Sequence, residues 1–245
     1  MNPIEGAHHQ RSSPGCWWLA KGHEELPTDL DWLSSEEHRH LARLRVEKRR
    51  HDWLLGRWTA KSALLESPYF LGSGTAPEDL TVWQAADGAP EALFRGRALP
   101  LTLSISHRSG RGLCVLAPEA LLVGCDLETV EARSPAFLQD YFTPDEQAAL
   151  RAAPANDRDR IATLFWGAKE SALKALRLGL RADTRRIRVE LPAESGADEK
   201  WCNLVVRDRE SDLGFGGWFR MLEGLTLVVV SSPPSEAPVS LVGNS

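Results

Sequence analysis

Two carboxylates stand close together at the end of an apolar segment with the pattern of a β-strand, Leu121–Glu128. Side chains alternate between the two faces of a strand, so Asp126 and Glu128 would point the same way, with Gly124 leaving open space beside them. Like charges side by side on a strand repel each other. A hard cation with oxygen ligands would offset this repulsion, whereas two acids at a solvent-exposed strand end would need no ligand. Both interpretations are open from this segment alone.

A helix expected over about residues 157–178 carries a third carboxylate. Its apolar stripe consists of Ile161, Leu164, Phe165, Ala168, Ala172, Ala175 and Leu176. Glu170 lies almost opposite the centre of that stripe, and Trp166 and Lys174 flank Glu170 one turn before and one turn after. A surface Glu–Lys pair accounts for the charges but not for the tryptophan. We therefore expect this face to be covered, either by the other half of the protein or by a ligand.

A serine–histidine pair ends the strand expected at residues 101–106. Such a pair is found in hydrolases, but Ser106 and His107 are adjacent on a strand and would point to opposite faces. The sequence also lacks the Gly-x-Ser-x-Gly turn that presents a nucleophilic serine. A histidine that contacts a phosphate or hydroxyl group is the better functional interpretation, and a histidine that serves only packing between domains is the alternative.

The segment 39–61 is strongly basic, although the chain as a whole is acidic with a formal net charge of −5. Its basic residues are Arg39, Arg43, Arg45, Lys48, Arg49, Arg50, Arg57 and Lys61. A solvated helix face would explain most of them, and a local phosphate-binding surface is the alternative. The net charge argues against a nucleic-acid-binding protein.

The composition is that of a globular protein, with 42% hydrophobic and 26% charged residues among 245. No apolar run approaches the ~18 residues that a membrane helix needs, and the polar N-terminus lacks the pattern of a signal peptide. The four cysteines, of which no two have CxxC spacing, are expected to be free thiols. We expect a cytoplasmic protein that binds neither membrane nor nucleic acid.

The halves of the chain show the same order of expected elements: one strand, two helices and then several strands. In the first half, Ser34 and Glu37 have the spacing of a helix capping box. In the second half, Thr143 and Glu146 have the same spacing, and Gly179 fits the end of the helix that follows. The tail from Ser231 on is rich in proline and serine and predicts irregular chain.

The expected strands lie near residues 16–20, 79–84, 101–106, 112–117, 121–128, 186–191, 201–207, 215–221 and 225–230. Together with the helices they predict an α+β protein of two similar α/β-sandwich halves, residues 1–118 and 119–245. Two such halves would form a cleft, which is a common place for a ligand.

Three short segments resemble, in order and spacing, the signature motifs of the Sfp-type 4′-phosphopantetheinyl transferase family. They are Ile105–His107, Gly124–Glu128 and Trp166–Ala175. Further segments that fit the family are Leu54–Arg57, Phe142–Glu146 and Leu178–Leu180. The resemblance covers about residues 34–191. It implies the fold of that family, in which two similar halves are related by pseudo-twofold symmetry and coenzyme A lies between them.

The resemblance also implies an activity: transfer of 4′-phosphopantetheine from coenzyme A to a serine of an apo acyl or peptidyl carrier protein, which releases adenosine 3′,5′-bisphosphate. Asp126, Glu128 and Glu170 would hold Mg²⁺ at the diphosphate of coenzyme A. Glu170 would also accept the proton of the carrier serine, directly or through water. Lys174 would contact the diphosphate and assist the leaving group.

The remaining roles that the resemblance implies concern the rest of coenzyme A. Ser106 and His107 would hold its adenosine phosphate end, and Arg43, Arg50 and Arg57 are candidates for contacts with other phosphates. The chain departs from the family where Gly88-Ala89-Pro90 replaces the frequent Gly-Lys-Pro, so one phosphate contact is missing. We expect the enzyme to be a monomer.

Two other functions could use the same residues. A metal-dependent phosphodiesterase or nuclease could employ the acidic cluster, but the acidic net charge argues against a nucleic-acid substrate. A module that binds coenzyme A or a carrier protein without chemistry is a third interpretation. The complete set of Asp126, Glu128, Glu170 and Lys174 argues against a purely binding role.

Overall fold

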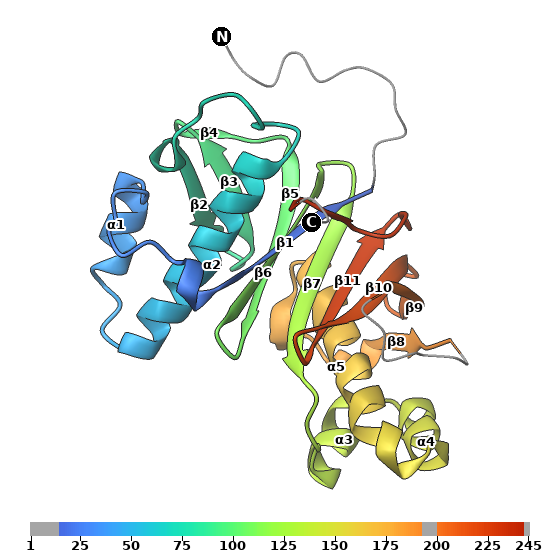
Figure 1. Cartoon of the computed structure of the whole chain (residues 1–245). Coiled ribbons are helices and arrows are strands. Elements are labelled where there is room, and N and C mark those ends of the chain that lie inside the picture. Colours follow the sequence, from blue (N-terminus) through green and yellow to red (C-terminus); the bar gives the residue numbers. More distant parts are fainter. Residues whose placement is uncertain (1–14, 193–199, 243–245) are drawn as a thin grey trace. The chain divides into compact units, whose positions relative to one another are not determined.

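The computed structural model of the protein describes residues 15–192 and 200–242. The chain divides into two compact units, one of Met1–Ala120 with Pro238–Ser245 and the other of Leu121–Ala237 (Figure 1). Each unit combines helices with a sheet, so the predicted α+β class is confirmed. None of the helices in the described ranges combines the length and the apolar character that crossing a membrane requires.

The first unit contains helices α1 (Ser35–Leu41) and α2 (Glu47–Glu66). One of its sheets has the strand order β12-β1-β6-β5, and the other has the order β2-β3-β4. The strands are β1 (Trp17–Gly22), β2 (Leu80–Gln84), β3 (Pro90–Phe94), β4 (Arg97–Ala98), β5 (Leu101–Arg108), β6 (Arg111–Pro118) and β12 (Val239–Ser240). Helix α2 packs against β1, β5 and β6, and its apolar residues join the core of this unit.

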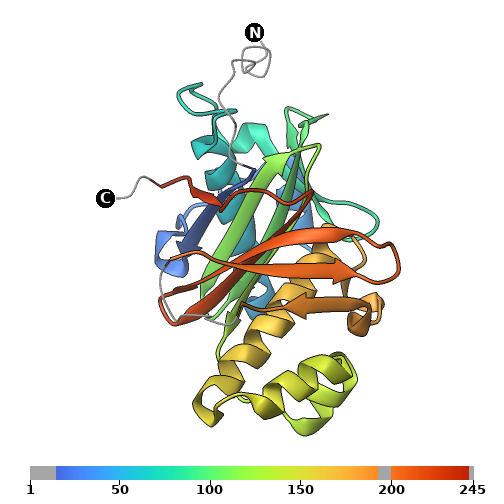
Figure 2. The same cartoon turned by 90° about the vertical axis from the view of Figure 1, so that its right-hand side faces the viewer.

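The second unit contains helices α3 (Pro135–Tyr141), α4 (Pro144–Ala152) and α5 (Arg158–Ala175). Its sheet has the order β7-β11-β10-β9-β8, with every neighbouring pair antiparallel. The strands are β7 (Leu122–Thr129), β8 (Ile187–Glu190), β9 (Cys202–Asp208), β10 (Gly214–Leu222) and β11 (Leu225–Ser232). Figure 2 shows α5 running along one face of this sheet.

Both predicted capping boxes are present at the helix starts. The Ser34 hydroxyl accepts from the backbone N–H of Glu37, and the Glu37 carboxylate accepts from the backbone N–H of Ser34. Thr143 and Glu146 make the same reciprocal pair at the start of α4. These bonds satisfy N–H groups that a helix start otherwise leaves without partners, and they fix where α1 and α4 begin.

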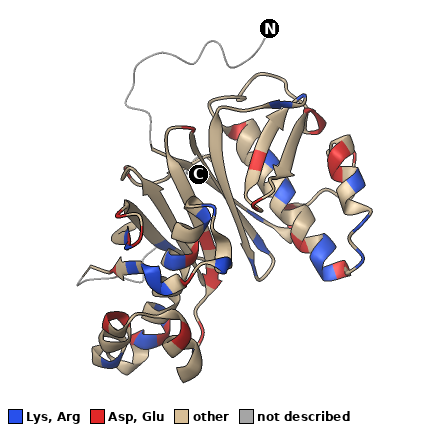
Figure 3. Cartoon of the chain, turned by 180° about the vertical axis from the view of Figure 1, so that it is seen from behind, with Lys and Arg blue, Asp and Glu red and all other residues tan. Residues whose placement is uncertain are grey.

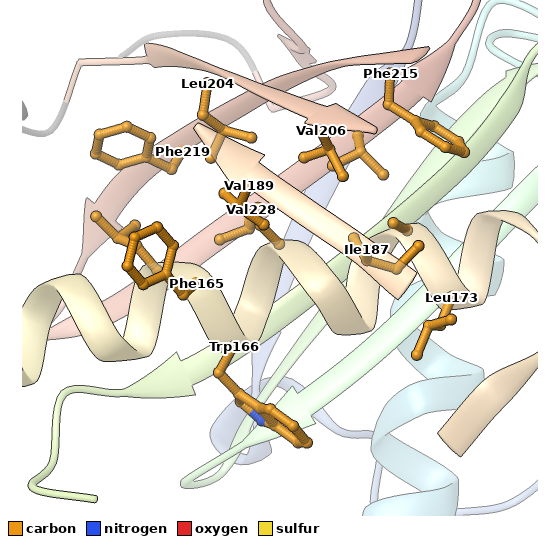
Figure 4. Packing of buried hydrophobic residues seen from close by; sticks show 14 of the residues in the cluster. Phe165, Trp166, Leu173, Ile187, Val189, Leu204, Val206, Phe215, Phe219 and Val228 are labelled. Carbon is orange, nitrogen blue, oxygen red and sulfur yellow. The ribbon is translucent and has the colours of Figure 1, made fainter. Parts of the chain in front are cut away.

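Helix α5 lies directly on β7 because Gly124 has no side chain. A Cβ built on Gly124 would lie 1.8 Å from the carbonyl oxygen of Ser171. The expected open space beside Gly124 is therefore wrong, since the helix backbone fills it. The core between α5 and the strands includes Phe165, Val189 and Val228 (Figure 4). Close packing at Gly124 thus sets the distance between the helix and the strand that carries Asp126.

The two units repeat one topology. In the first, β1 pairs with β6 and β6 with β5, all antiparallel, and α1 and α2 follow β1 in the chain. In the second, β7 pairs with β11 and β11 with β10 in the same sense, and α4 and α5 follow β7. Helix α3 lies between β7 and α4, where the first unit has only the 3-10 turn His23–Glu25. The pseudo-twofold relation between the halves stays a prediction.

Two local predictions are wrong or incomplete. The tail after Ser231 is not wholly irregular, because Val239–Ser240 pairs with β1 of the first unit. Gly179 does not end α5: Arg177 adopts the left-handed conformation with φ of 58°. The N–H groups of Arg177 and Leu178 bond the carbonyls of Lys174 and Leu173, which is the Schellman ending with arginine where glycine is usual.

Several elements had no sequence expectation at all. Helix α3 and strands β3, β4 and β12 are short, and short elements give too few residues for a periodic pattern. The other 3-10 helices are Pro77–Asp79, Ala155–Asp157, Gly179–Arg181 and Thr184–Arg186. All four cysteines are free thiols, and all but Cys202 are buried.

Candidate active site

The acidic pair on β7 is buried. Asp126 is 3% exposed and Glu128 is 8% exposed, so the alternative of two acids at a solvent-exposed strand end is wrong. Both side chains lie on the face of β7 that packs against α5, as contacts with Lys174 and Trp166 of that helix show. A buried carboxylate is costly unless cations or hydrogen-bond donors compensate it, so each of these acids requires a partner.

Lys174 is the partner of Asp126. Its Nζ donates to Oδ1 of Asp126 at 2.8 Å and to the backbone oxygen of Cys125 at 2.9 Å. The same Nζ lies 4.0 Å from Oε2 of Glu170, one helical turn away. Burial opposes the charged form, but attraction to Asp126, Cys125 and Glu170 outweighs it and raises the pKa of Lys174 to about 12. Lys174 is therefore a permanent cation between the two carboxylates.

Glu170 is the carboxylate with the least compensation. Burial and then repulsion by Asp126 raise the pKa of Glu170 to about 7, with a smaller contribution from Glu128, while Lys174 and Arg133 act in the opposite direction. The side chain of Glu170 is 18% exposed, so solvent can reach it. A carboxylate that titrates near neutral pH is suited to accept a proton in a reaction. The carboxylate of Glu170, which the sequence predicts to be the catalytic base, thus has electrostatic surroundings that suit this role.

Glu128 is held by two side chains that come from different elements. Its Oε1 accepts from Nε1 of Trp166 at 3.1 Å, and its Oε2 accepts from Arg133 at 3.3 Å. Arg133 lies in the loop after β7 and was not among the predicted site residues. No pattern in the sequence singles it out, because a residue in a loop has no periodic position. Only the folded loop brings its guanidinium to the carboxylate.

Trp166 is covered by helix α3, which answers the question that the sequence left open. Its ring lies 4.9 Å from that of Phe137 and 5.2 Å from that of Tyr141, both edge-on. In Figure 4 the Trp166 side chain leaves α5 on the side away from Val189 and Val206. Trp166 is therefore covered by a helix of its own unit, and the expectation that the other half of the protein or a ligand covers it is wrong. Trp166 thereby presents its N–H to Glu128.

The donor set of this site suits a hard divalent cation. Carboxylate oxygens are the ligands that Mg²⁺ prefers, and it commonly takes one or two of them together with phosphate oxygens and water. Asp126 and Glu128 both act electrostatically on Glu170, so the three carboxylates share one region. Within the described residues, however, no three carboxylate, imidazole or thiolate groups form a ready-made metal cluster. Any metal here would therefore need ligands from a substrate as well.

The first unit holds a second candidate region, at Arg57. This side chain lines a pocket of about 100 Å³ whose other lining residues are Glu36, Glu37, His40, Trp53, Val82, Trp83 and Gln84. The Arg57 guanidinium carbon lies 5.0 Å from the Trp53 ring centroid, and His40 stacks on that ring at 5.1 Å. Within the described chain, Nε of Arg57 is buried without a hydrogen-bond partner. Burial lowers the pKa of Arg57, and Glu37 offsets this in part.

The other predicted basic contacts separate into two kinds. Arg43 is exposed. Burial is the largest cause that lowers the pKa of His40, and the positive charges of Arg57 and Arg43 lower it further. This effect indicates that all three residues lie near the pocket. Arg50 has a structural role, because its Nη1 donates to the backbone oxygens of Leu41 and Leu44 at the end of α1. Figure 3 shows blue basic residues along helix α2.

Ser106 and His107 lie near the end of β5, as predicted. Ser106 is 7% exposed, whereas His107 is exposed, so neighbouring residues face opposite sides of the strand as a β-strand requires. This geometry supports the expectation that the two do not form a catalytic pair with each other. Their roles toward a ligand stay predictions.

Comparisons with known proteins point to one family. Residues 122–210 match the family model of the 4′-phosphopantetheinyl transferase superfamily. This range contains β7 with its acidic pair and α5 with Glu170 and Lys174. No curated protein is significantly similar to the chain.

Several solved structures are similar to part of the chain. One is a holo-(acyl-carrier-protein) synthase from Bacillus anthracis in complex with CoA (3′,5′-ADP), with 19% identity, a TM-score of 0.35, and coverage of 42% of this chain and 94% of that one. A holo-[acyl-carrier-protein] synthase from Helicobacter pylori in complex with coenzyme A has 14% identity and a TM-score of 0.30, covering 42% and 98%. The synthase from Thermotoga maritima has 17% identity and a TM-score of 0.36, covering 53% and 74%.

Proposed function

We propose that this protein, whose residues 122–210 match the family model of the 4′-phosphopantetheinyl transferase superfamily, transfers the 4′-phosphopantetheine group of coenzyme A to a serine of an acyl or peptidyl carrier protein. The observation that carries the proposal is the arrangement of Asp126, Lys174 and Glu170 within the matched range. The lysine nitrogen lies 2.8 Å from one carboxylate and 4.0 Å from the other. The three signature segments favour the Sfp-type branch of the superfamily.

The proposed reaction exchanges one oxygen on phosphorus for another. The hydroxyl oxygen of the carrier serine attacks the diphosphate phosphorus that bears the pantetheine arm. The bond from that phosphorus to the bridging oxygen breaks, and adenosine 3′,5′-bisphosphate leaves with the bond electrons. Glu170 accepts the hydroxyl proton, directly or through water, because its carboxylate is reachable from solvent and lies beside Lys174. Transfers of this kind need positioning and charge neutralisation more than covalent help from the enzyme.

Lys174 supplies fixed positive charge for this step. Its pKa of about 12 keeps it protonated throughout the physiological range. Asp126 holds its Nζ at 2.8 Å, which orients the ammonium group beside Glu170. We assign Lys174 to the diphosphate, where it would offset the negative charge that grows on the leaving group. Trp166 and Arg133 keep Glu128 oriented toward the same region.

We assign a divalent metal, Mg²⁺, to the carboxylates of Asp126, Glu128 and Glu170. The residues fit the ion by the chemistry of their donors and by the mutual repulsion that raises the pKa of Glu170, which a cation would relieve. When held by these carboxylates, the ion would offset negative charge on the diphosphate and stabilise charge that develops in the transition state.

We assign contacts with the rest of coenzyme A to residues of the first unit. The buried guanidinium of Arg57 suits a phosphate, since arginine binds phosphate through several N–H groups at once, and Arg43 adds charge near the same pocket. Ser106 and His107 are assigned to the adenosine phosphate end. Arg50 is the weakest of these assignments, because Leu41 and Leu44 already accept its hydrogen bonds.

The test is a transfer assay with purified protein, coenzyme A, Mg²⁺ and a small panel of apo carrier proteins. Mass spectrometry should show a carrier heavier by one phosphopantetheine group, and adenosine 3′,5′-bisphosphate should appear in equal amount. If no carrier in the panel gains mass, the proposed function is wrong. A parallel reaction without carrier protein detects hydrolysis of coenzyme A or nucleotides, which a phosphodiesterase would show.

A further inference from the structure

A buried ion pair joins three elements of the second unit beside the proposed active site. Nζ of Lys169, which immediately precedes Glu170 on α5, lies 2.9 Å from Oε2 of Glu146, the capping-box residue of α4. The other carboxylate oxygen of Glu146 accepts from the backbone N–H of Val189 on β8. Lys169 also donates to the backbone oxygens of Thr184 and Ile187. Both charged side chains are almost completely buried, at 0% and 2% exposure.

The first unit contains the same arrangement. Nζ of Lys61 on α2 lies 2.5 Å from Oε2 of Glu37, the capping-box residue of α1. The other carboxylate oxygen of Glu37 accepts from the backbone N–H of Val82 on β2, and Lys61 donates to the backbone oxygen of Trp32. These side chains are also 0% and 2% exposed. In each unit, one lysine, one capping-box glutamate and one strand N–H lock two helices to a strand; we call this arrangement the clamp.

The sequence carries the same repeat, although it is short. Helix α2 contains Trp58-Thr59-Ala60-Lys61, and helix α5 contains Trp166-Gly167-Ala168-Lys169. The two segments share tryptophan, alanine and lysine at the same spacing. The residues that follow differ: Glu170 and Lys174 of α5 correspond to Ser62 and Glu66 of α2. The clamp is therefore common to both units, whereas the proposed base Glu170 and the cation Lys174 have counterparts of other residue types in the first unit.

Each clamp lies next to a different part of the proposed machinery. Lys169 is bonded directly to Glu170 in the chain, so a helix held at Lys169 fixes the backbone from which the proposed base projects. Lys61 lies one turn after Arg57 on α2, at the spacing that places two side chains on neighbouring positions of one helix face. Glu37 lines the Arg57 pocket and acts electrostatically on Arg57.

Buried ion pairs are poor sources of stability, because the loss of hydration offsets most of the attraction between the charges. Replacing both partners with apolar residues is often neutral or stabilising, whereas the geometry that a fully hydrogen-bonded pair imposes is specific. Each of the two carboxylates accepts bonds from both a lysine and backbone N–H groups, so few alternative arrangements satisfy them. Orientation is thus the property that the clamps supply.

We infer that the two clamps are positioning devices with separate tasks: Lys169 with Glu146 sets the place of Glu170 and thereby kcat, and Lys61 with Glu37 sets the place of Arg57 and thereby the KM for coenzyme A. The inference rests on the proposed function. Neither lysine touches the reacting atoms in this scheme. Each acts through a neighbour on its own helix.

The experiment compares matched variants of the two clamps, Lys169→Met and Lys61→Met, in the full-length protein. Methionine keeps the length of the side chain and removes its charge, and both sites are equally buried, so the losses of stability should be similar. We expect Lys169→Met to lower kcat at least about tenfold with little change in KM, since small displacements of a catalytic group cost this much. Lys61→Met should raise the KM for coenzyme A several-fold and leave kcat within about twofold.

The outcomes separate cleanly. Similar losses of kcat in both variants, or similar gains in KM, would show that the clamps act only through general stability and would overturn the inference. Where a single variant fails to fold, Lys169→Met with Glu146→Gln and Lys61→Met with Glu37→Gln remove the uncompensated carboxylate, and the same split is expected. A wild-type protein that transfers no phosphopantetheine overturns the proposed function itself and the inference with it. A wild-type protein that is active, with variants that do not split, overturns the inference alone.

Discussion

Nζ of Lys174 donates to Oδ1 of Asp126 at 2.8 Å and thereby joins helix α5 to strand β7 in the middle of the acidic cluster. One cation thus offsets a buried carboxylate that repels Glu170. The arrangement is asymmetric, because Glu170 lies farther from the same nitrogen, at 4.0 Å. Asp126 orients the lysine, and Glu170 is left with a raised pKa and the capacity to take a proton.

Removing the charge of Lys174 should reduce turnover far more than folding. We expect Lys174→Met to lower kcat by about a hundredfold, as the loss of one electrostatic contact to a developing negative charge commonly does. Steady-state transfer to a carrier protein measures the effect, and circular dichroism shows that the variant is folded. The exposed Lys200 provides a matched control, and Lys200→Met should be as active as the wild type. Equal rates for Lys174→Met and the wild type would remove Lys174 from the mechanism.

The elements that position the site were largely predictable from local signals. The capping boxes at Ser34 and Thr143 marked two helix starts, and alternation marked β5 and β7. The tryptophan of the Trp–Glu–Lys face of α5 is covered, although by α3 rather than by the expected other half of the protein or a ligand. These features depend on residues close together in the chain, which is why periodicity and capping reveal them.

What escaped prediction depends on contacts between distant residues. Arg133 contacts Glu128 only because the loop after β7 folds back toward it. The space beside Gly124 is occupied by the backbone of α5 and is not open. Lys169 lies on the apolar stripe of its helix, where a charged residue has no explanation from the sequence alone. The fold supplies the explanation, because it places Glu146 next to Lys169. The repeated Trp-x-Ala-Lys segment was the available signal for that clamp, but a match of three residues is weak without the fold.

The raised pKa of Glu170 predicts that this residue destabilises the protein at neutral pH. A pKa of about 7 in the folded protein, against an ordinary value of 4.5, means that the folded protein binds this proton more tightly than the unfolded chain does. The cost is absent below about pH 4.5, grows as the pH rises toward 7, and is fully present above it. Glu170→Gln should therefore raise the free energy of unfolding by about 3 kcal/mol at pH 8, measured without metal by urea unfolding.

The same substitution should change the free energy of unfolding little at pH 4, because residue 170 is then largely neutral in the wild type as well as in the variant. Activity should be lost at every pH, because glutamine accepts no proton. A stability difference between Glu170→Gln and the wild type that is independent of pH would contradict the electrostatic explanation. Surface residue Glu190 provides a control, and Glu190→Gln should show no such pH dependence.

Mg²⁺ should stabilise the protein through the same carboxylates. Because the ion would bind the folded state, saturating Mg²⁺ together with coenzyme A should raise Tm. The free energy of unfolding should rise by about 2.7 kcal/mol at a ligand concentration a hundred times the dissociation constant. Asp126→Asn should lose most of the metal-dependent part of this rise in Tm. The control Asp145→Asn, which changes an exposed residue of α4, should keep it. A metal-dependent shift of full size in Asp126→Asn would show that the ion binds elsewhere.

Arg57 and Arg50 should respond differently to the same change. Arg57→Leu should raise the KM for coenzyme A by about tenfold or more with little effect on kcat, because a phosphate contact made equally in the ground and transition states affects binding alone. Arg50→Leu should instead lower the free energy of unfolding by about 1–2 kcal/mol, since it removes hydrogen bonds to the last carbonyls of α1. If the two variants exchange these phenotypes, the pocket at Arg57 is not the phosphate contact.

Gly124 should tolerate no side chain, although it lies on a strand where alanine is normally acceptable. A Cβ at this position would lie 1.8 Å from the carbonyl oxygen of Ser171 and 2.8 Å from the backbone nitrogen of Ala175, so α5 would have to move away from β7. We expect Gly124→Ala to lose about 2–3 kcal/mol of stability through overpacking and to lose turnover as Glu170 and Lys174 shift with the helix. Gly214→Ala, where a Cβ meets no atom within 4 Å, is the control and should be near neutral. If Gly124→Ala keeps wild-type stability and turnover, the close contact between α5 and β7 is not what sets the distance from Asp126 to Lys174.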